Sequence, residues 1–138
     1  MTEPDWDPVP LIAGSGGVLT EELRTSHSGR KALMLTRQED PSEFLALAEA
    51  MEIEVIEIVA QRGRSNPRLH LGKGRLESIR DELRMAPESH PWFGIDLILV
   101  NANLTPRQLV NMTDILQCET WDRVRLLLEL FTQHASSV

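Results

Sequence analysis

The sequence predicts an α/β domain built on a small parallel β-sheet of about four strands flanked by helices. Short apolar runs alternate along the chain with segments of helical periodicity, which is the order expected when parallel strands are joined by helical crossovers. Two of the helical segments also begin with a capping residue followed by proline, so their starts are marked independently of hydrophobicity.

Four strands are expected, at residues 32–35, 53–59, 96–100 and 117–120. The run 96–100 contains four consecutive apolar residues, which is typical of a central strand covered on both faces. The run 53–59 is rich in Ile and Val, but Glu54 and Glu57 interrupt it, so this strand is expected to be partly exposed.

Helices are expected between these strands and after the last of them. The first begins with the capping-box sequence Asp40-Pro41-Ser42-Glu43, and the second covers residues 75–85. The third begins with a second capping box, residues 105–108, and the last runs from the cap Asp122 to His134. Apolar residues three or four positions apart are expected to face the core: Phe44, Leu47, Ala48 and Met51, then Leu76, Ile79 and Leu83, then Leu109, Met112 and Leu116.

The chain has 138 residues, which is room for one domain. Residues 1–30 are rich in Pro, Gly and Ser and have little apolar periodicity, so they are interpreted as a flexible N-terminal tail. Residues 31–138 form the predicted domain. A hydrophobic content of 41% and a charged content of 25% are ordinary for a globular protein with its own core.

Compartment and membrane association follow from cysteine usage and the apolar runs. Cys118 is the single cysteine, so no intramolecular disulfide can form, and a reducing cytoplasm is expected. No apolar run has the length that spans a bilayer, and the acidic, proline-containing start does not resemble a secretory signal. A membrane partner is therefore not expected.

Charge is unevenly distributed along the chain. The net charge of −7 counts against a general nucleic-acid binder. Residues 62–75, however, contain no acid and five basic residues, and without these five the chain keeps nine basic residues against 21 acidic ones. Both a solvated loop and a phosphate-binding loop are compatible with such a run. The five residues are Arg62, Arg64, Arg68, Lys73 and Arg75.

The Gly72-Lys73-Gly74 turn stands at the start of a predicted helix. Two glycines allow a ligand close to the backbone, and first-turn N–H groups attract anions. Lys73 and Arg75 can add contacts to phosphate oxygens. Together with the other three arginines, this turn predicts a site that grips a nucleic-acid backbone without reading bases.

Catalytic and metal sites are not expected. The four histidines lack metal-ligand spacing and there are no paired cysteines. Cys118 lies at the edge of a predicted strand, where a buried structural thiol is commoner than a nucleophile. A P-loop is missing, because Pro67 stands where its first glycine would be and Gly74 replaces the hydroxyl residue. The sequence therefore predicts no catalytic residue and no cofactor in this chain.

The last helix carries apolar residues on more than one face. Such a helix is either pinned deep in its own core or leaves an apolar surface open to a partner. The second alternative predicts a partner interface at Leu126, Leu127, Leu130 and Phe131.

Three stretches resemble the N-terminal domain of the HflX family of translational GTPases, over about residues 31–136. Residues 69–79 resemble the family's Tyr-Ile-Gly-x-Gly-Lys segment and the helix after it. Residues 96–108 resemble its strand and Leu-Ser/Thr-Pro-x-Gln cap, and residues 122–131 its Asp-Arg-Thr segment and following helix. Four positions depart from the family pattern: His70 replaces an aromatic residue, Val110 a basic one, Val124 a threonine and His134 an arginine.

This resemblance implies a module that binds the large ribosomal subunit or ribosomal RNA. The contacts carried over are Arg68, Lys73 and Arg75, with Arg64 added from the charge pattern. GTP hydrolysis, with its GTP and Mg²⁺, belongs to a G domain that these residues do not contain, so this chain itself is not expected to be an enzyme. The four departures are expected to affect RNA or interdomain contacts and not the fold.

Two other functions remain open from the sequence. One is a protein-interaction or dimerisation domain, which would pair through its last helix with a separate G-domain protein or with itself. The other is a small nucleotide-binding enzyme that uses the Gly72-Lys73-Gly74 turn. For this last alternative we expect no binding of GTP or ATP.

Overall fold

The computed structural model describes residues 27–37, 40–61 and 67–136, and the predicted α/β fold is confirmed. Four parallel strands form one sheet in the order β2-β1-β3-β4. The strands are β1 (Lys31–Thr36), β2 (Glu54–Ala60), β3 (Ile95–Val100) and β4 (Glu119–Trp121). Strand β1 pairs with β3, although β2 and α3 lie between them in the sequence. Local sequence patterns do not predict this strand order.

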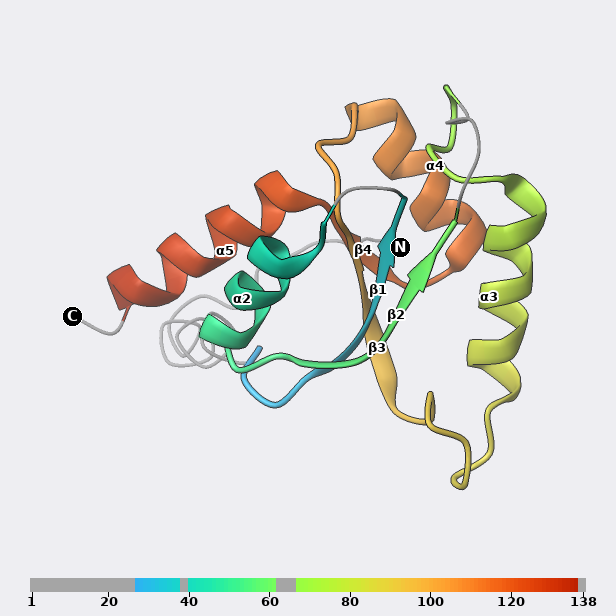
Figure 1. The fold of residues 1–138 in the computed structure, drawn as a ribbon, viewed down its shortest axis with the longest axis horizontal. Coiled ribbons are helices and arrows are strands. Elements are labelled where there is room, and N and C mark those ends of the chain that lie inside the picture. Colours follow the sequence, from blue (N-terminus) through green and yellow to red (C-terminus); the bar gives the residue numbers. More distant parts are fainter. Residues whose placement is uncertain (1–26, 38–39, 62–66, 137–138) are drawn as a thin grey trace, which may run out of the picture.

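Two layers of helices enclose the sheet (Figure 1). Helices α2 (Ser42–Ala50) and α5 (Arg123–Ser136) pack on one face, and α3 (Lys73–Met85) and α4 (Pro106–Leu116) pack on the other. Because all strands run in one direction, every helix begins at the carboxyl ends of the strands. We call this side the carboxyl edge of the sheet, and the opposite side the amino edge.

The two central strands divide the core into two clusters. Leu33 and Ile98 face α3 and α4, whereas Met34 and Leu99 face α2 and α5. All four side chains are fully buried. The continuous apolar run 96–100 was therefore correctly interpreted as a strand covered on both faces.

The edge strand β4 is shifted from its predicted position. The sequence predicted it at residues 117–120, but Gln117 adopts φ of 54° and ends α4 in the left-handed conformation. Its N–H donates to the Thr113 carbonyl oxygen at 2.8 Å. The strand consequently begins at Glu119 and includes Trp121, which is fully buried under α5.

Two helix starts also differ from their predicted positions. Helix α3 begins at Lys73, two residues before the predicted Arg75. At α2, Pro41 occupies the cap position and not the first helical position, so the expected capping box does not form. Asp40 still accepts a hydrogen bond from the Ser42 N–H at 3.0 Å, which satisfies one donor of the first turn.

The capping box of α4 is confirmed. The Gln108 N–H donates to Thr105 Oγ1 at 3.1 Å, and the Thr105 N–H donates to Gln108 Oε1 at 3.0 Å. Gln108 Nε2 also donates to the Pro67 carbonyl oxygen at 3.1 Å. The start of α4 therefore supports the segment that leads into α3.

Removing this cap is expected to destabilise the domain measurably. Thr105→Ala leaves the Gln108 N–H without its acceptor, which should lower the free energy of unfolding by about 1 kcal/mol. Urea unfolding followed by circular dichroism measures the loss. Thr113→Ala is the matched control, because the Thr113 hydroxyl only donates back to the Leu109 carbonyl within the same helix. An equal loss in both variants would contradict a role for the cap.

Residues 27–30 belong to the fold, although the sequence placed them in the tail. The Gly29 N–H donates to the Glu52 carbonyl oxygen at 2.7 Å, and Gly29 has φ of +83°, which favours glycine. His27 Nε2 lies 3.1 Å from Glu129 Oε1 of α5. The remainder of the predicted tail, residues 1–26, lies outside the described residues. Within the described part of the chain, no helix is long and apolar enough to cross a membrane.

Candidate nucleic-acid interface

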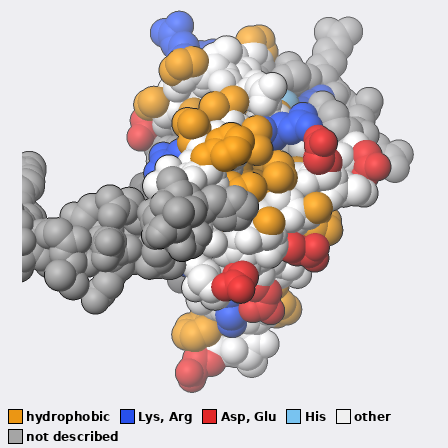
Figure 2. Space-filling model, turned by 90° about the vertical axis from the view of Figure 1, so that its left-hand side faces the viewer, with side chains coloured by type: hydrophobic (Ala, Val, Ile, Leu, Met, Phe, Trp, Pro, Cys, Tyr) orange, Lys and Arg blue, Asp and Glu red, His pale blue; other side chains and the backbone are white. Residues whose placement is uncertain are grey.

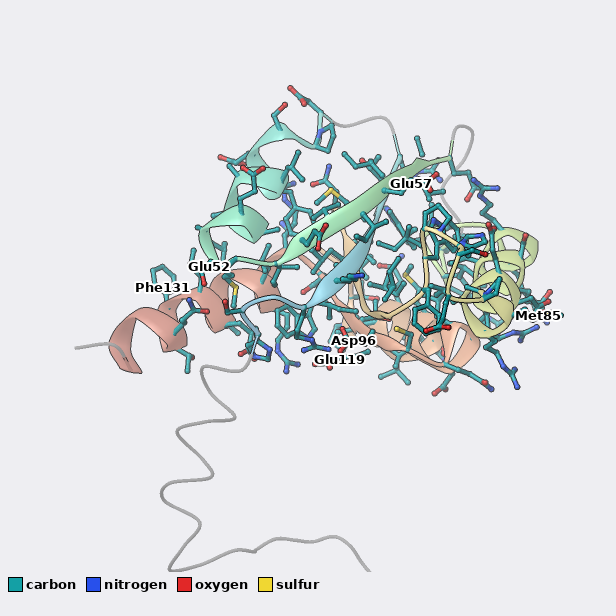
Figure 3. The ribbon with its side chains drawn as sticks, turned by 90° about the horizontal axis from the view of Figure 1, so that it is seen from below. Glu52, Glu57, Met85, Asp96, Glu119 and Phe131 are labelled. Carbon is teal, nitrogen blue, oxygen red and sulfur yellow. The ribbon has the colours of Figure 1, made fainter. Side chains whose placement is uncertain are left out.

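Acidic side chains gather at the amino edge of the sheet. Figure 3, seen from this side, shows Asp96 at the start of β3 beside Glu119 at the start of β4. Arg30 links them, with Nε 3.2 Å from Asp96 Oδ1 and Nη2 2.8 Å from Glu119 Oε1. Glu52 and Glu54 lie at the same edge, next to the beginning of β2. The carboxylates at this edge disfavour the approach of a polyanion.

Glu119 remains ionised despite its partial burial. Burial by itself raises its pKa, but hydrogen bonds from Arg30 and from Trp121 Nε1 outweigh this effect and hold the pKa below its usual value. The amino edge therefore keeps its negative charge at neutral pH.

Basic side chains lie at the opposite, carboxyl edge. They come from the ends of strands and the starts of helices: Arg37 after β1, Arg68 and Lys73 before and at the start of α3, Arg107 in α4 and Arg123 in α5. Arg123 approaches Glu43 at 3.3 Å, and the Arg123 side chain is half-buried whereas that of Glu43 is exposed. A partly exposed pair of this kind neutralises little of the surrounding positive potential.

Three helices carry a cation in their first turn, although α5 is already capped by the Asp122 carboxylate, whose Oδ1 accepts from the Arg125 N–H at 2.9 Å. The first turns of α3, α4 and α5 contain basic residues and no acidic ones. Because a helix N-terminus carries partial positive charge, each such cation costs about 0.3–1 kcal/mol. In α3 the first-turn N–H groups also receive no side-chain cap from the described residues. A bound anion would remove these penalties.

Arg68 and Lys73, two of the predicted phosphate contacts, line the same cavity. Its volume is about 350 Å³, and its other lining residues are Leu69, Asn111, Asp114 and Ile115. Asn111 Nδ2 donates to the Arg68 carbonyl oxygen at 3.2 Å, so α4 positions the backbone of this segment. Asn111 and Asp114 were missed from the sequence, since only the packing of α3 against α4 brings them to Lys73.

Arg75 does not join this group. It lines a different cavity, of about 290 Å³, together with Glu57, Glu82 and Trp92. Residues two positions apart on a helix project about 200° apart, so Lys73 and Arg75 cannot share one face of α3. The prediction that both act on one ligand site is corrected accordingly. Arg62 and Arg64 lie outside the described residues.

The two glycines of the turn have different surroundings. The Gly72 N–H already donates to Gln61 Oε1 at 3.1 Å, and a Cβ at Gly72 would lie 3.1 Å from Gln61 Nε2. A side chain at Gly72 would require the end of the Gln61 side chain to shift by a few tenths of an ångström, and the Gly72 N–H already has an acceptor. A Cβ at Gly74 would meet nothing within 4 Å, so open space in front of this residue leaves its backbone accessible.

The point where the winding of the sheet reverses lies between β1 and β3, the usual position of a nucleotide in open α/β sheets. Here Asn101 Nδ2 donates to Thr36 Oγ1 at 3.1 Å, and both side chains are buried. Arg37 Nη1 donates to the His70 carbonyl oxygen at 3.3 Å. Side chains and the segment before α3 thus occupy this position. Among the described residues, no group of His, Cys, Asp or Glu could hold a metal ion.

The predicted partner interface on α5 is only half exposed. Leu126 and Leu130 are buried in the core against the sheet, so they cannot form a free surface. Leu127 and Phe131 are exposed, together with Val124 and Leu128, which the sequence did not include. The four exposed residues share one face of the helix, which we call the α5 stripe. Figure 2 shows hydrophobic side chains gathered on this end of the molecule.

Cys118 is expected to react slowly with alkylating agents. Burial first, and then the negative charges of Asp96 and Glu119, raise the pKa of its thiol to about 11. Only the thiolate reacts, and its greater intrinsic nucleophilicity compensates for part of its scarcity, so the rate at pH 8 should be about tenfold below that of free cysteine. The rate of iodoacetamide labelling should keep rising above pH 9. A plateau near neutral pH would contradict this expectation.

The fold and the charge distribution define a class of protein, namely a doubly wound α/β domain with basic side chains at its carboxyl edge. A family model described as "GTP-binding GTPase N-terminal" matches residues 38–132, and the chain belongs to this family. The resemblance of the sequence to the N-terminal domain of HflX GTPases is thereby confirmed.

Individual relatives agree with this assignment. The chain is 36% identical over 101 residues to the GTPase HflX of Caldanaerobacter subterraneus subsp. tengcongensis, a match that covers 72% of this chain and 22% of that protein. It is 33% identical over 96 residues to the GTPase HflX of Thermococcus kodakarensis, covering 70% and 20%. The chain therefore corresponds to about a fifth of the length of these relatives.

Solved structures share the fold. A GTP-binding protein from the hyperthermophilic archaeon Sulfolobus solfataricus, in complex with GDP, superimposes with a TM-score of 0.57 at 24% identity, covering 74% of this chain and 30% of that one. The G235S variant of SsGBP gives a TM-score of 0.60 at 24% identity, covering 76% and 32%. At this level of identity the likeness concerns the fold alone.

Proposed function

We propose that this domain is an RNA-binding module that contacts the large ribosomal subunit through its carboxyl edge and hydrolyses no GTP itself. The observation that supports the proposal best is the placing of cations in the first turns of α3 and α4, which contain no acidic residue, so that the cations lower stability in the absence of an anion. Sequence features that break a local rule are typical of functional sites.

The separation of charge supports an oriented complex. The basic residues of the carboxyl edge attract a polyanion, whereas Asp96 and Glu119 at the amino edge, beside Arg30, offer it less attraction. Phosphate contacts of this kind position a protein on RNA. We place the function in the cytoplasm, which contains ribosomes and keeps thiols such as that of Cys118 reduced.

Co-sedimentation with purified large subunits tests the proposal. Binding should weaken steeply between low and physiological salt, because each phosphate contact releases counterions. The triple variant Arg64→Glu, Arg68→Glu and Lys73→Glu should abolish binding. If that variant still sediments with the subunits, the proposed interface is wrong. GTP and ATP should show no binding to the chain by calorimetry, and GTP with Mg²⁺ is assigned to a separate G domain.

The α5 stripe supports a second candidate function. Its four side chains are between 38% and 66% exposed and lie on one helix face: Val124, Leu127, Leu128 and Phe131. A contiguous exposed apolar surface of this kind is typical of a site that binds a partner. In this alternative the stripe pairs with a G-domain protein or with a second copy of the chain. Sedimentation equilibrium and binding of a hydrophobic dye test it, and a concentration-independent monomer that binds no dye would contradict it.

A further inference from the structure

We infer that the cavity between α3 and α4 binds one unpaired guanine base of the RNA whose phosphates lie on the carboxyl edge. This inference rests on the proposed function and extends it, since backbone contacts alone carry no sequence information. The cavity is lined by Arg68, Leu69, Lys73, Asn111, Asp114 and Ile115. Figure 1 shows the beginning of α3 beside α4, on the right of the molecule.

Cavity size favours a single base. A volume of about 350 Å³ lies at the lower end of the range of ligand pockets, which is about 300–1,000 Å³. A larger cavity of about 630 Å³ borders β2, but Glu49, Glu52, Glu54 and Glu57 line it, so it repels nucleic acid. The cavity between α3 and α4 combines its smaller size with two cationic side chains, Arg68 and Lys73, at the carboxyl edge.

The inner wall of the cavity offers an apolar surface. Leu69 is buried in the core next to α3, and Ile115 is half-buried on α4. A base that has left its stack is commonly held against apolar side chains or against the plane of an arginine guanidinium group. Arg68 at the rim of the cavity can supply such a plane.

The polar wall consists of hydrogen-bond acceptors. The amide nitrogen of Asn111 donates to the Arg68 carbonyl oxygen, which leaves Asn111 Oδ1 as the remaining polar atom of that side chain. Asp114 follows one helical turn later, on the same face of α4, and forms no hydrogen bond or ion pair with the described residues. Guanine presents two adjacent donors, N1–H and the N2 amine, on its Watson–Crick edge. A carboxylate accepts both of them, whereas adenine, cytosine and uracil place an acceptor within this edge.

Charge at the cavity explains why a base enters and a phosphate does not. Lys73 also forms no ion pair with the described residues, although Asp114 lines the same cavity. The Asp114 carboxylate repels a phosphate group from the interior, while Lys73 and Arg68 attract phosphates at the rim. An uncharged base inside the cavity can accept the contact with Asp114, while its phosphates outside contact Lys73 and Arg68.

The test uses labelled oligouridylates of one length that carry a central guanosine, adenosine or inosine, with binding to the full chain measured by fluorescence anisotropy. The guanosine probe should bind about tenfold more tightly than the adenosine probe. Inosine, which lacks the N2 amine, should fall between them. Asp114→Asn should abolish the preference without weakening binding of the adenosine probe, because asparagine pairs with adenine.

Asp81→Asn is the matched control, since it makes the same chemical change on an exposed part of α3 outside the cavity. It should leave the guanosine preference intact. Equal binding of all three probes, or a preference that persists in Asp114→Asn, would overturn the inference and leave the proposed function standing. Failure of every probe to bind, even at low salt, would overturn the RNA-binding function and this inference together.

Discussion

Reversing two charges at the carboxyl edge, with Arg68→Glu and Lys73→Glu together, should lower the affinity for large ribosomal subunits at least about 100-fold. Both side chains are exposed and line one cavity, so each substitution removes an attractive contact and adds a repulsive one. The slope of log affinity against log salt should also decrease by about two. Co-sedimentation at several salt concentrations measures both effects.

The Lys73→Glu substitution of this double variant should not destabilise the fold. Lys73 occupies the first position of α3, where glutamate would interact favourably with the helix dipole by about 0.3–1 kcal/mol. Loss of binding together with unchanged or higher resistance to urea would mean that these residues serve a ligand and not the fold. A variant that both unfolds and fails to bind would contradict this interpretation.

The control is a second double reversal, Lys31→Glu with Arg84→Glu, which changes the net charge by the same amount. Lys31 begins β1, and Arg84 is in the last turn of α3, so both lie toward the amino edge. Their reversal should weaken binding about threefold at most, through long-range effects that salt screens. An equal loss in both double variants would mean that overall charge, and not the carboxyl edge, governs binding.

Replacing Trp121 by alanine should destabilise the domain by about 3–5 kcal/mol. Trp121 is fully buried in the cluster beneath α2 and α5, and its Nε1 donates to Glu119 Oε2 at 2.8 Å. The His27 ring stands edge-on to it with centroids 4.8 Å apart, and the guanidinium groups of Arg30 and Arg125 lie 5.7 and 5.3 Å from the ring. One side chain thus joins the N-terminal turn, β4 and α5.

A loss of this size is a large share of the 5–15 kcal/mol that stabilise a domain. Urea unfolding followed by circular dichroism should show a much lower midpoint for Trp121→Ala. Phe131→Ala is the control, because this aromatic side chain on α5 is 66% exposed and its loss should cost at most about 0.5 kcal/mol. If Phe131→Ala proved equally destabilising, the α5 stripe would be part of the core and not a surface.

The comparison of α5 in sequence and structure shows what periodicity alone can predict. The sequence correctly places the Asp122 cap, whose Oδ1 accepts from the Arg125 N–H at 2.9 Å. It cannot distinguish Leu126 from Leu127, because apolar residues surround the helix. Contact with the sheet decides that Leu126 is buried and Leu127 is exposed.

The candidate site also has features that the sequence predicts and features that only packing determines. The concentration of cations in residues 62–75 and the glycine turn at a helix start are local features, so the sequence was sufficient to propose a phosphate-binding segment there. Helix geometry then turns Arg75 away from Lys73, and the packing of α4 on α3 brings Asn111 and Asp114 to the same cavity.

By itself the sequence determined the class of fold and the cap of α4, as well as the two-sided burial of β3, since each depends on neighbours within one or two helical turns or one strand. Tertiary structure alone decided the order β2-β1-β3-β4, the separation of the cationic from the acidic edge, and the set of side chains that share a cavity. These features depend on which segments, distant along the chain, bury their apolar faces against each other.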